Sequence, residues 1–253
     1  MKKIRKIVVN KIHQLSQNMK RITLTGEDLK DFPENEDGGY VKFLFSKKSK
    51  SSKENLVRPY SIRAFRKNTL EIDIDFSNHF GDQGYATKWA NETKIGDEIY
   101  ISGPGPKQNI NLNLDWFLFA GDMTALPSIS VHLERLPSNA SVIAVIEVLS
   151  ENDIIPLNKT KKTQVKWIVK SKKNEQNFIN TVTNIEWLDG EPFIWVACEY
   201  SKMVQLRNFF LKQRNIKKEN TYISSYWKMG LNQEEHKNLK KKDSIEWKQS
   251  QSI

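Results

Sequence analysis

A short run of residues, Arg58-Pro59-Tyr60-Ser61, combines side chains that could hold a ligand made of a diphosphate and a flat ring. A guanidinium can bind a diphosphate through two hydrogen bonds at once. On an extended strand Tyr60 points to the same face as Arg58, so its ring could lie against the flat part of the ligand. Ser61 supplies a hydroxyl for a ring nitrogen. The run predicts a binding strand, although an ordinary surface strand could have the same composition.

Two glycine turns could bind phosphate. Gly84-Tyr85-Ala86-Thr87 opens a predicted helix, where free backbone N–H groups and the positive end of the helix dipole would face an anion. Gly121-Asp122-Met123-Thr124 joins a buried strand to a helix, which is where doubly wound sheets bind nucleotide phosphates. Thr124 could cap that helix or contact a phosphate. Each turn alone is also compatible with a plain helix start.

Other kinds of chemistry have little support. The four histidines, His13, His79, His132 and His236, are far apart and lack metal-ligand spacing. Neither a Walker loop, a GxSxG elbow nor a GxGxxG turn occurs. The lone cysteine excludes a disulfide scaffold, and no apolar run is long enough for a membrane helix. The basic start lacks the apolar core of a signal peptide, so we expect a cytoplasmic protein without stable membrane insertion.

The candidate residues need elements to position them, and the first half of the chain is rich in short strand patterns. Runs of β-branched and aromatic residues are separated by turn formers such as Asp37-Gly38-Gly39 and Gly103-Pro104-Gly105-Pro106. Regularly spaced short strands predict an antiparallel β-barrel or sandwich. The predicted strands are 6–11, 20–25, 40–45, 58–66, 69–76 and 97–102, with one helix at 86–92.

From residue 116 onward, continuous apolar runs alternate with amphipathic stretches. This pattern is typical of a Rossmann-like, doubly wound parallel sheet. The predicted strands are 116–120, 141–149, 165–170, 193–198 and 221–226, and the helices are 124–136, 175–187 and 201–213. We therefore expect a β-barrel domain over 1–112, an α/β domain over 113–236 and a disordered polar tail over 237–253.

The net charge of +10 is concentrated in three stretches, 1–21, 47–67 and 212–253. Such a basic field attracts anions of any kind, including nucleic acid, although lysine-rich loops also simply keep proteins soluble. No helix-turn-helix, RNP string or zinc finger accompanies the charge. Nucleic-acid binding by a non-enzymatic protein is therefore a remote alternative.

The order of these motifs resembles the ferredoxin-reductase superfamily, and the finer strings resemble the siderophore-interacting family of ferric-siderophore reductases. The resemblance spans roughly residues 4–236. Its most specific strings are Gly121–Pro127 and Tyr226-Trp227-Lys228-Met229-Gly230. Further matching strings are 58–63, His79 with 84–89, 103–106, and 195–199 followed by Arg207.

The resemblance implies an FAD site on the barrel and an NADH or NADPH site on the sheet. The residues that it implies for FAD are Arg58, Pro59, Tyr60, Ser61, Arg63, His79, Gly84, Tyr85, Ala86 and Thr87. Those that it implies for the nicotinamide nucleotide are Gly121, Asp122 and Thr124. The catalytic candidates are Ser61, near the reactive flavin nitrogen, and Glu199, near the meeting point of the two cofactors. The substrate-binding candidates are Tyr226, Trp227 and Lys228.

Three positions depart from the family pattern, and at one of them Met229 stands where many relatives have a second arginine, so one positive charge is missing there. Tyr85 stands where relatives usually have proline, which alters the stiffness of the loop but not its N–H groups. Cys198 stands where relatives usually have glycine, and we interpret it as a small buried hydrophobe rather than a redox thiol.

The preferred hypothesis is a monomeric, FAD-dependent enzyme that takes electrons from NADH or NADPH and reduces ferric siderophores, with release of Fe(II). No metal ligands from the protein are required. Lys228 and the lysines of loop 47–53 are candidates for attracting an anionic ferric chelate, although that loop could also be merely solvated. The alternative enzyme is a general NAD(P)H:flavin or ferredoxin reductase, and reduced ferredoxin as the donor stays open. Glu147 at the end of the second sheet strand, followed by Glu151 and Asp153, favours NADH because these acids could contact ribose hydroxyls. Lys161, Lys162 and the pair Lys172-Lys173 could instead contact the 2′-phosphate of NADPH.

Overall fold

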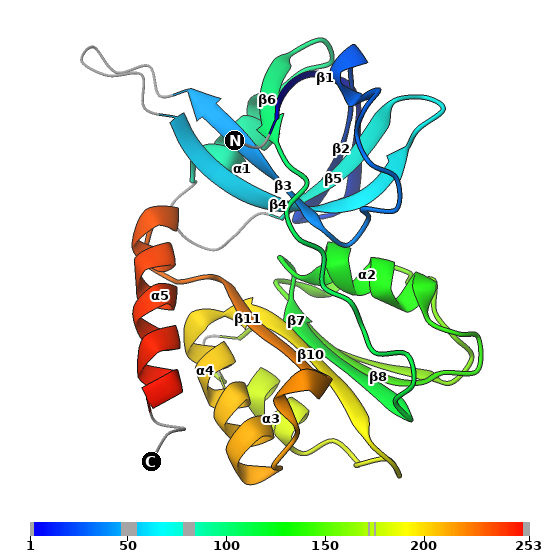
Figure 1. Cartoon of the computed structure of the whole chain (residues 1–253), viewed down its shortest axis with the longest axis vertical. Coiled ribbons are helices and arrows are strands. Elements are labelled where there is room, and N and C mark those ends of the chain that lie inside the picture. Colours follow the sequence, from blue (N-terminus) through cyan, green and yellow to red (C-terminus); the bar gives the residue numbers. More distant parts are fainter. Residues whose placement is uncertain (1–2, 47–54, 78–83, 172, 175, 250–253) are drawn as a thin grey trace.

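The computed structural model describes residues 3–46, 55–77, 84–171, 173–174 and 176–249. Within these residues the chain forms a β-barrel followed by a parallel sheet with helices on both faces, as the sequence predicts (Figure 1). Residues 103–115 connect the two halves, between the last barrel strand and the first sheet strand. His79 and the lysines of loop 47–53 lie outside the described residues.

In the described part of the chain, six antiparallel strands close into the barrel in the order β1-β2-β5-β4-β3-β6. Their bounds are β1 Ile4–Ser16, β2 Met19–Thr25, β3 Tyr40–Ser46, β4 Asn55–Arg66, β5 Glu71–Ser77 and β6 Glu98–Ser102. Helix α1 (Tyr85–Glu92) packs against the barrel. The alternation in β5 shows why the barrel forms, because Ile72, Ile74 and Phe76 enter the apolar core between outward-facing acids.

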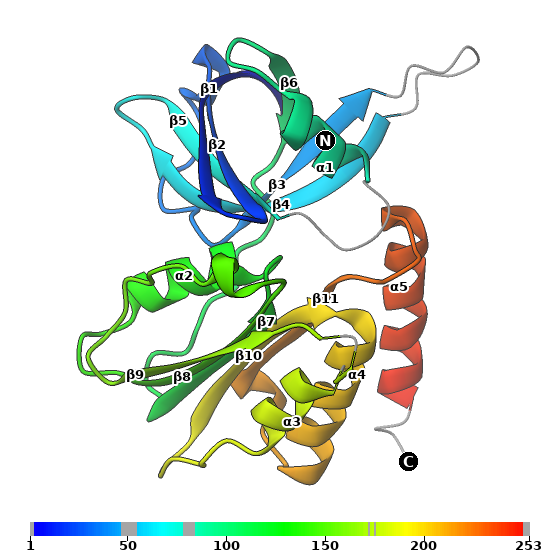
Figure 2. The ribbon, with the colours of Figure 1, turned by 180° about the vertical axis from the view of Figure 1, so that it is seen from behind.

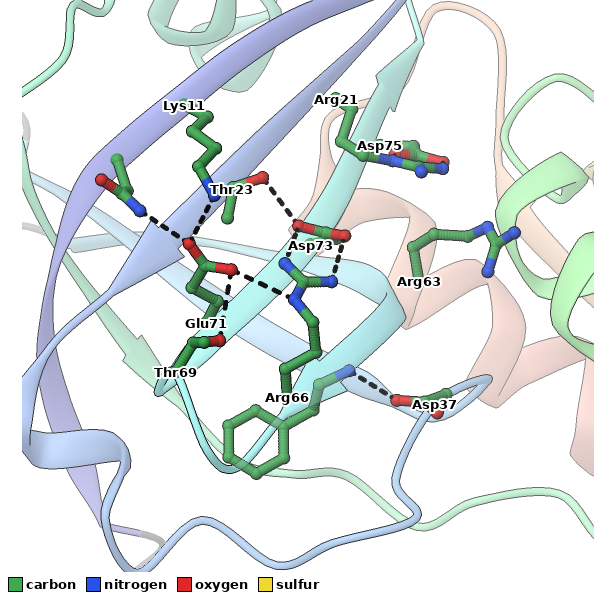
Figure 3. A network of polar contacts seen from close by, with 12 residues as sticks. Lys11, Arg21, Thr23, Asp37, Arg63, Arg66, Thr69, Glu71, Asp73 and Asp75 are labelled. Carbon is green, nitrogen blue, oxygen red and sulfur yellow. Dashed lines mark hydrogen bonds and ion pairs between the residues drawn. The ribbon is translucent and has the colours of Figure 1, made fainter.

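The outward-facing acids of β5 are covered by cations from neighbouring strands (Figure 3). Glu71 accepts hydrogen bonds from Lys11 and Arg66, and Asp73 accepts two from Arg66. Asp75 pairs with Arg21 at 2.6 and 2.8 Å. Since a buried carboxylate needs donors to replace water, these pairs allow an acidic strand to be covered.

The second half is a five-stranded parallel sheet, within the described residues, in the order β11-β10-β7-β8-β9. Its strands are β7 Trp116–Asp122, β8 Ser141–Val148, β9 Thr163–Val169, β10 Pro192–Glu199 and β11 Thr221–Trp227. Helix α2 (Leu126–Arg135) lies between the sheet and the barrel, whereas α3 (Asn177–Thr183) and α4 (Tyr200–Asn208) cover the opposite face (Figures 1 and 2). The strand order reverses between β7 and β10, and ligands of doubly wound sheets bind outside such a switch point.

The expectation of a disordered tail over 237–253 is wrong for the residues described, because helix α5 spans Gln233–Gln249. Asn232 caps this helix by accepting hydrogen bonds from the amides of Glu234 and Glu235 at 2.9 and 3.1 Å. One face of the helix then docks through polar and aromatic side chains, so the sequence shows no apolar period. These contacts are His236 with Ser225, Lys240 with Ser224, Asp243 with Arg207, and Trp247 beneath Arg207.

Candidate active site

Strand β4 carries Arg58, which lies opposite Phe43 of β3 in the barrel. Arg58 is half-buried, and its Nη1 donates to the Val57 carbonyl at 3.0 Å. Burial lowers the pKa of Arg58, and no carboxylate among the described residues pairs with its guanidinium. A partly desolvated cation without a carboxylate partner fits an anionic group such as the diphosphate of FAD.

Tyr60 lies within an aromatic cluster on the same strand. Its ring centroid is 4.4 Å from that of Phe76, and Phe43 meets it edge-on at 5.5 Å. Trp89 of α1 packs against Phe76 at 5.6 Å, which ties the helix to this cluster. Burial raises the pKa of Tyr60, so its phenol stays neutral at ordinary pH. A neutral ring in such a cluster suits contact with the flat ring of a flavin.

The start of α1 has the features of an open anion site. Among the described residues, no side chain caps this helix at Gly84, and a Cβ there would meet none of their atoms within 4 Å. Tyr85 is 47% exposed, whereas Ala86 is buried against the barrel. The first-turn amides are therefore available for a diphosphate, in agreement with the site of FAD that the motifs predict.

Pro59, the next residue after Arg58 on β4, is exposed.

Ser61 and Arg63 both turn toward the second domain. Ser61 Oγ accepts a hydrogen bond from Ser128 Oγ of α2 at 2.8 Å. Arg63 forms two hydrogen bonds with the Glu134 carboxylate of the same helix, the Nη1–Oε2 distance being 3.0 Å. The positive charge of Arg63 is thus already neutralised, so its predicted contact with FAD has no support from its present partners.

The turn after β7 packs tightly. A Cβ on Gly121 would lie 2.7 Å from Ala125 Cβ and 2.8 Å from the Ala197 carbonyl, so only glycine fits between β7, β10 and α2. Asp122 Oδ1 accepts from both the amide and the hydroxyl of Thr124, at 2.9 and 2.5 Å. The prediction that Thr124 caps α2 is wrong, because this hydroxyl is directed back to Asp122 and Ala125 occupies the cap position. A phosphate contact by Thr124 stays a prediction.

Asp122 also joins the strand ends across the switch point. Its Oδ2 accepts from the Glu199 amide at 3.0 Å and from Trp227 Nε1 at 2.8 Å. Asp122, Thr124 and Trp227 line a small hollow together with Glu147 and Lys170. The ends of β7, β10 and β11 are therefore held together where a nucleotide would dock.

Glu199 and Lys228 come together at this edge. Lys228 Nζ lies 3.0 Å from Glu199 Oε1 and donates to Ser201 Oγ at 2.7 Å. Burial alone would raise the pKa of Glu199, but Lys228 and the amides of Met229 and Ser201 lower it below its ordinary value. Glu199 is therefore ionised at neutral pH and is a proton acceptor rather than a donor.

Tyr226 is half-buried and Cys198 is fully buried, and substrate binding by Tyr226 stays a prediction. Tyr226 meets the Trp195 ring edge-on at 6.3 Å, and burial raises the pKa of its hydroxyl well above the ordinary value. Cys198 is fully buried in the sheet, and burial likewise raises the pKa of its thiol. The interpretation of Cys198 as a small buried hydrophobe is confirmed.

The comparisons with known proteins agree with both halves of this arrangement. The model of the siderophore-interacting FAD-binding domain matches residues 8–55 and 46–108, and that of the siderophore-interacting protein matches residues 114–230. An uncharacterised protein of Mycobacterium tuberculosis is 30% identical over 203 residues, covering 76% of this chain and 71% of that protein. The chain belongs to the siderophore-interacting protein family.

Two further relatives of this siderophore-interacting protein span almost the whole chain. The ferric vibriobactin reductase ViuB of Vibrio cholerae is 28% identical over 238 residues, which are 87% of this chain and 88% of ViuB. The crystal structure of the siderophore-interacting protein SipS from Aeromonas hydrophila superposes with a TM-score of 0.87 and 28% identity, covering 96% of this chain and 99% of SipS. The barrel of this siderophore-interacting protein is an FAD-binding domain, and Arg58, Tyr60 and the start of α1 fit that cofactor.

Sequence reasoning missed the residues of this siderophore-interacting protein that join its domains. Ser128 and Glu134 of α2 contact strand β4. The prediction that Asp153 contacts a ribose is wrong, because Asp153 is fully buried and holds the turn between β1 and β2. Asp153 had a local signal, because Ser150 stands three residues earlier in a capping-box pattern. Glu134 had no such signal, because an acidic residue on an amphipathic helix does not indicate its partner in the sequence. In the described residues no helix is long and apolar enough to cross a membrane.

Proposed function

We propose that this chain reduces ferric siderophores with electrons from a nicotinamide nucleotide. The observation that carries the proposal is the half-buried Arg58, which has no carboxylate partner among the described residues. Three residues later on the same strand, Ser61 contacts α2. The strand that would hold the flavin is therefore in direct contact with the helix that follows the nucleotide turn. The name of the relative ViuB supports a ferric siderophore as the substrate.

The chain's own residues bind and orient the reactants. Arg58 and the first amides of α1 hold the diphosphate, while the Tyr60 cluster supports the flat ring. FAD, when bound, supplies the conversion of one hydride from NAD(P)H into two single-electron transfers, each to one Fe(III), with release of one proton. Ser61 Oγ is placed between the barrel and α2, where it can donate to a ring nitrogen. Glu199 can accept a proton at its carboxylate because it is ionised.

Lys228 is the proposed contact for an anionic ferric chelate. Its side chain is 27% exposed at the edge of the sheet, and Met229 beside it is 57% exposed. The pair with Glu199 directs the ammonium group to this edge. In the part of the chain that the structure describes, no group of His, Cys, Asp or Glu could hold a metal ion, and iron enters this reaction as part of the substrate.

NADH is the proposed donor. Glu147 ends β8, where an acidic residue in a doubly wound sheet accepts hydrogen bonds from ribose hydroxyls and disfavours a 2′-phosphate. Lys202 Nζ contacts both Glu147 oxygens at 2.5 and 2.6 Å, so this lysine is already occupied by a carboxylate. Burial raises the pKa of Glu147, and Lys202 opposes that effect.

The decisive experiment is purification followed by flavin spectroscopy. We expect a yellow protein that releases FAD on denaturation and is bleached anaerobically by NADH faster than by NADPH. Adding a ferric hydroxamate or a ferric catecholate should restore the colour, with two Fe(II) trapped by a ferrous chelator for each NADH consumed. A colourless protein that cannot be loaded with FAD would overturn the proposal. Rapid reduction of free flavin or ferredoxin, with no reduction of ferric chelates, would favour a general reductase.

A further inference from the structure

Asp153 makes an unusual contact across the boundary between the two domains. It lies in a single 3-10 turn, Glu151–Asp153, after β8 and is fully buried. Its Oδ1 accepts from Ser16 Oγ at 2.8 Å and from the Asn18 amide at 2.7 Å. Its Oδ2 accepts from Asn18 Nδ2 at 2.8 Å and from the Ser150 amide at 3.1 Å. Three of these four donors belong to the barrel hairpin formed by β1 and β2.

No cation pairs with Asp153 among the described residues, so hydrogen bonds alone compensate its buried charge. Because such bonds are short and directional, a shift of the hairpin by about 1 Å would weaken several of them together. The same hairpin inserts Met19, which is 1% exposed, into the apolar core on the α2 side of the sheet. We call the contact of Asp153 with Ser16 and Asn18 the hairpin clasp.

A second contact joins β4 to α2. Arg63 binds Glu134 through two hydrogen bonds, and Ser61, on the same strand, binds Ser128 on the same helix. Strand β4 carries the residues proposed to hold FAD, and α2 begins directly after the nucleotide turn at Gly121–Thr124. The Arg63–Glu134 bridge thus connects the strand of the proposed FAD site with the far end of the helix that follows the nucleotide turn.

A pocket of about 220 Å³, open to solvent, lies beside the Arg63–Glu134 bridge at the boundary between the domains. The barrel contributes Leu15, Met19 and Arg63 to its wall, and the second domain contributes Leu126, Glu134 and Leu157. The pocket interrupts the packing on this side of the boundary, although Leu15 and Leu157 pack against the same apolar core as Met19. Polar contacts around the pocket, including those of Arg135 with Asp37, therefore contribute to the angle between the domains.

We propose that Asp153, Arg63 and Glu134 are positioning residues that align the nicotinamide with the flavin. Hydride transfer needs the reacting atoms about 3–3.5 Å apart, and a misplacement of about 1 Å can cost a hundredfold in rate. Anchors at separate points of the boundary fix a rotation that a single anchor would leave free. The proposal rests on the proposed function, since it concerns the geometry of that same site.

The first test compares two Asp→Asn substitutions in the holoenzyme. In Asp153→Asn the side-chain NH₂ would face donors of the hairpin, so the clasp should open. We expect the rate constant for flavin reduction by NADH, measured by anaerobic rapid mixing, to fall about tenfold or more. The affinity for FAD, and the rate at which pre-reduced enzyme reduces a ferric chelate, should change less than twofold.

Asp73→Asn is the matched control. Asp73 is also buried, and its partners Thr23 and Arg66 both belong to the barrel. This variant should lose thermal stability yet keep the rate of hydride transfer. Equal slowing in both variants would show a general effect of destabilisation and would overturn the proposal. If Asp153→Asn does not fold, Asn18→Ala removes one donor of the clasp instead. This variant should also slow flavin reduction selectively, but by a smaller factor.

The second test exchanges the charges of the bridge. Arg63→Glu and Glu134→Arg should each slow flavin reduction, and the double variant should recover most of the rate. Failure of the double variant to recover, with weakened FAD binding in Arg63→Glu alone, would show that Arg63 acts on FAD and not through Glu134.

A third measurement does not depend on activity. Scanning calorimetry of the full chain should show one unfolding transition for the wild type and for Asp73→Asn, and two resolved transitions for Asp153→Asn. A single transition in Asp153→Asn would contradict the clasp. If the wild-type protein binds no FAD, the proposed reductase function fails, whereas the calorimetric result still decides whether Asp153 couples the domains.

Discussion

Lys228 Nζ lies 3.0 Å from Glu199 Oε1 and ties the end of β11 to the end of β10. The ammonium group compensates the charge of the buried carboxylate, and the carboxylate holds the ammonium group at the edge of the sheet. The proposed substrate contact and the proposed catalytic carboxylate are therefore one coupled pair. Any change to Lys228 will also raise the pKa of Glu199, since Lys228 is one of the groups that lower it.

Replacing Lys228 with alanine should weaken reduction of anionic ferric chelates selectively. We expect kcat/KM for a ferric catecholate to fall about tenfold, the size of one charge-assisted contact. Flavin reduction by NADH, measured by rapid mixing, should fall by a smaller factor, because this step feels the substitution only through the raised pKa of Glu199. Lys217→Ala is the control, because Lys217 forms a similar 2.9 Å pair with Glu191, just before the opposite end of β10. Equal losses in the two variants would contradict a substrate role for Lys228.

Replacing Arg58 with alanine should raise the dissociation constant for FAD by about ten- to a hundredfold, because a charge-assisted contact with the diphosphate is lost. A fluorescence titration of the flavin-free protein measures this. Arg66→Ala provides the control on the same strand, since Arg66 pairs with Glu71 and Asp73 instead. Stronger loss of FAD affinity in Arg66→Ala than in Arg58→Ala would show that the diphosphate lies elsewhere.

Adding one methyl group to Gly121 should destabilise the sheet domain by about 1–3 kcal/mol, because the new Cβ would overlap Ala125 and the Ala197 carbonyl. Urea unfolding of Gly121→Ala measures this free energy. Gly84→Ala is the contrasting variant, since its Cβ would meet no atom within 4 Å, and its stability should stay within about 0.5 kcal/mol of the wild type. A neutral Gly121→Ala would mean that α2 can move away from β7.

The acidic strand β5 should make stability depend on acid pH. Lys11 lowers the pKa of Glu71, and Arg66 and Thr23 lower that of Asp73 against the opposing effect of burial. Lowered folded-state values stabilise the protein above the ordinary values of 4.5 and 3.8, and this stability disappears as pH falls through the folded-state values.

Arg66→Ala tests this acid dependence. The variant should be less stable than the wild type by about 1 kcal/mol at neutral pH, and the difference should shrink as pH falls below about 4. Thermal melts across pH 3–7 measure the effect. A difference that stays constant with pH would show that Arg66 contributes through packing rather than through its charge.

Local patterns in the sequence predicted most of the elements. The alternation in β5 and the unbroken apolar runs of β7, β8 and β10 are local properties, and they distinguished a barrel strand from a strand buried on both faces. Helix α5 escaped prediction because its docking face consists of His236, Lys240, Asp243 and Trp247, whose partners lie on β11, on α4 and just beyond it. A helix that docks through a polar face shows no periodic pattern of apolar residues, so hydrophobic periodicity does not predict it.

The sequence alone thus determined the order of a barrel and a doubly wound sheet, the two glycine turns, and a family resemblance that the comparisons bear out. Only the tertiary structure decided the long-range partners: Arg63 meets Glu134, and Asp153 holds the barrel hairpin. The reason is physical. Periodicity and turn chemistry act within a few residues, whereas the partner of a charge is selected by packing between segments that are 70 or more positions apart in the chain, as with Arg63 and Glu134.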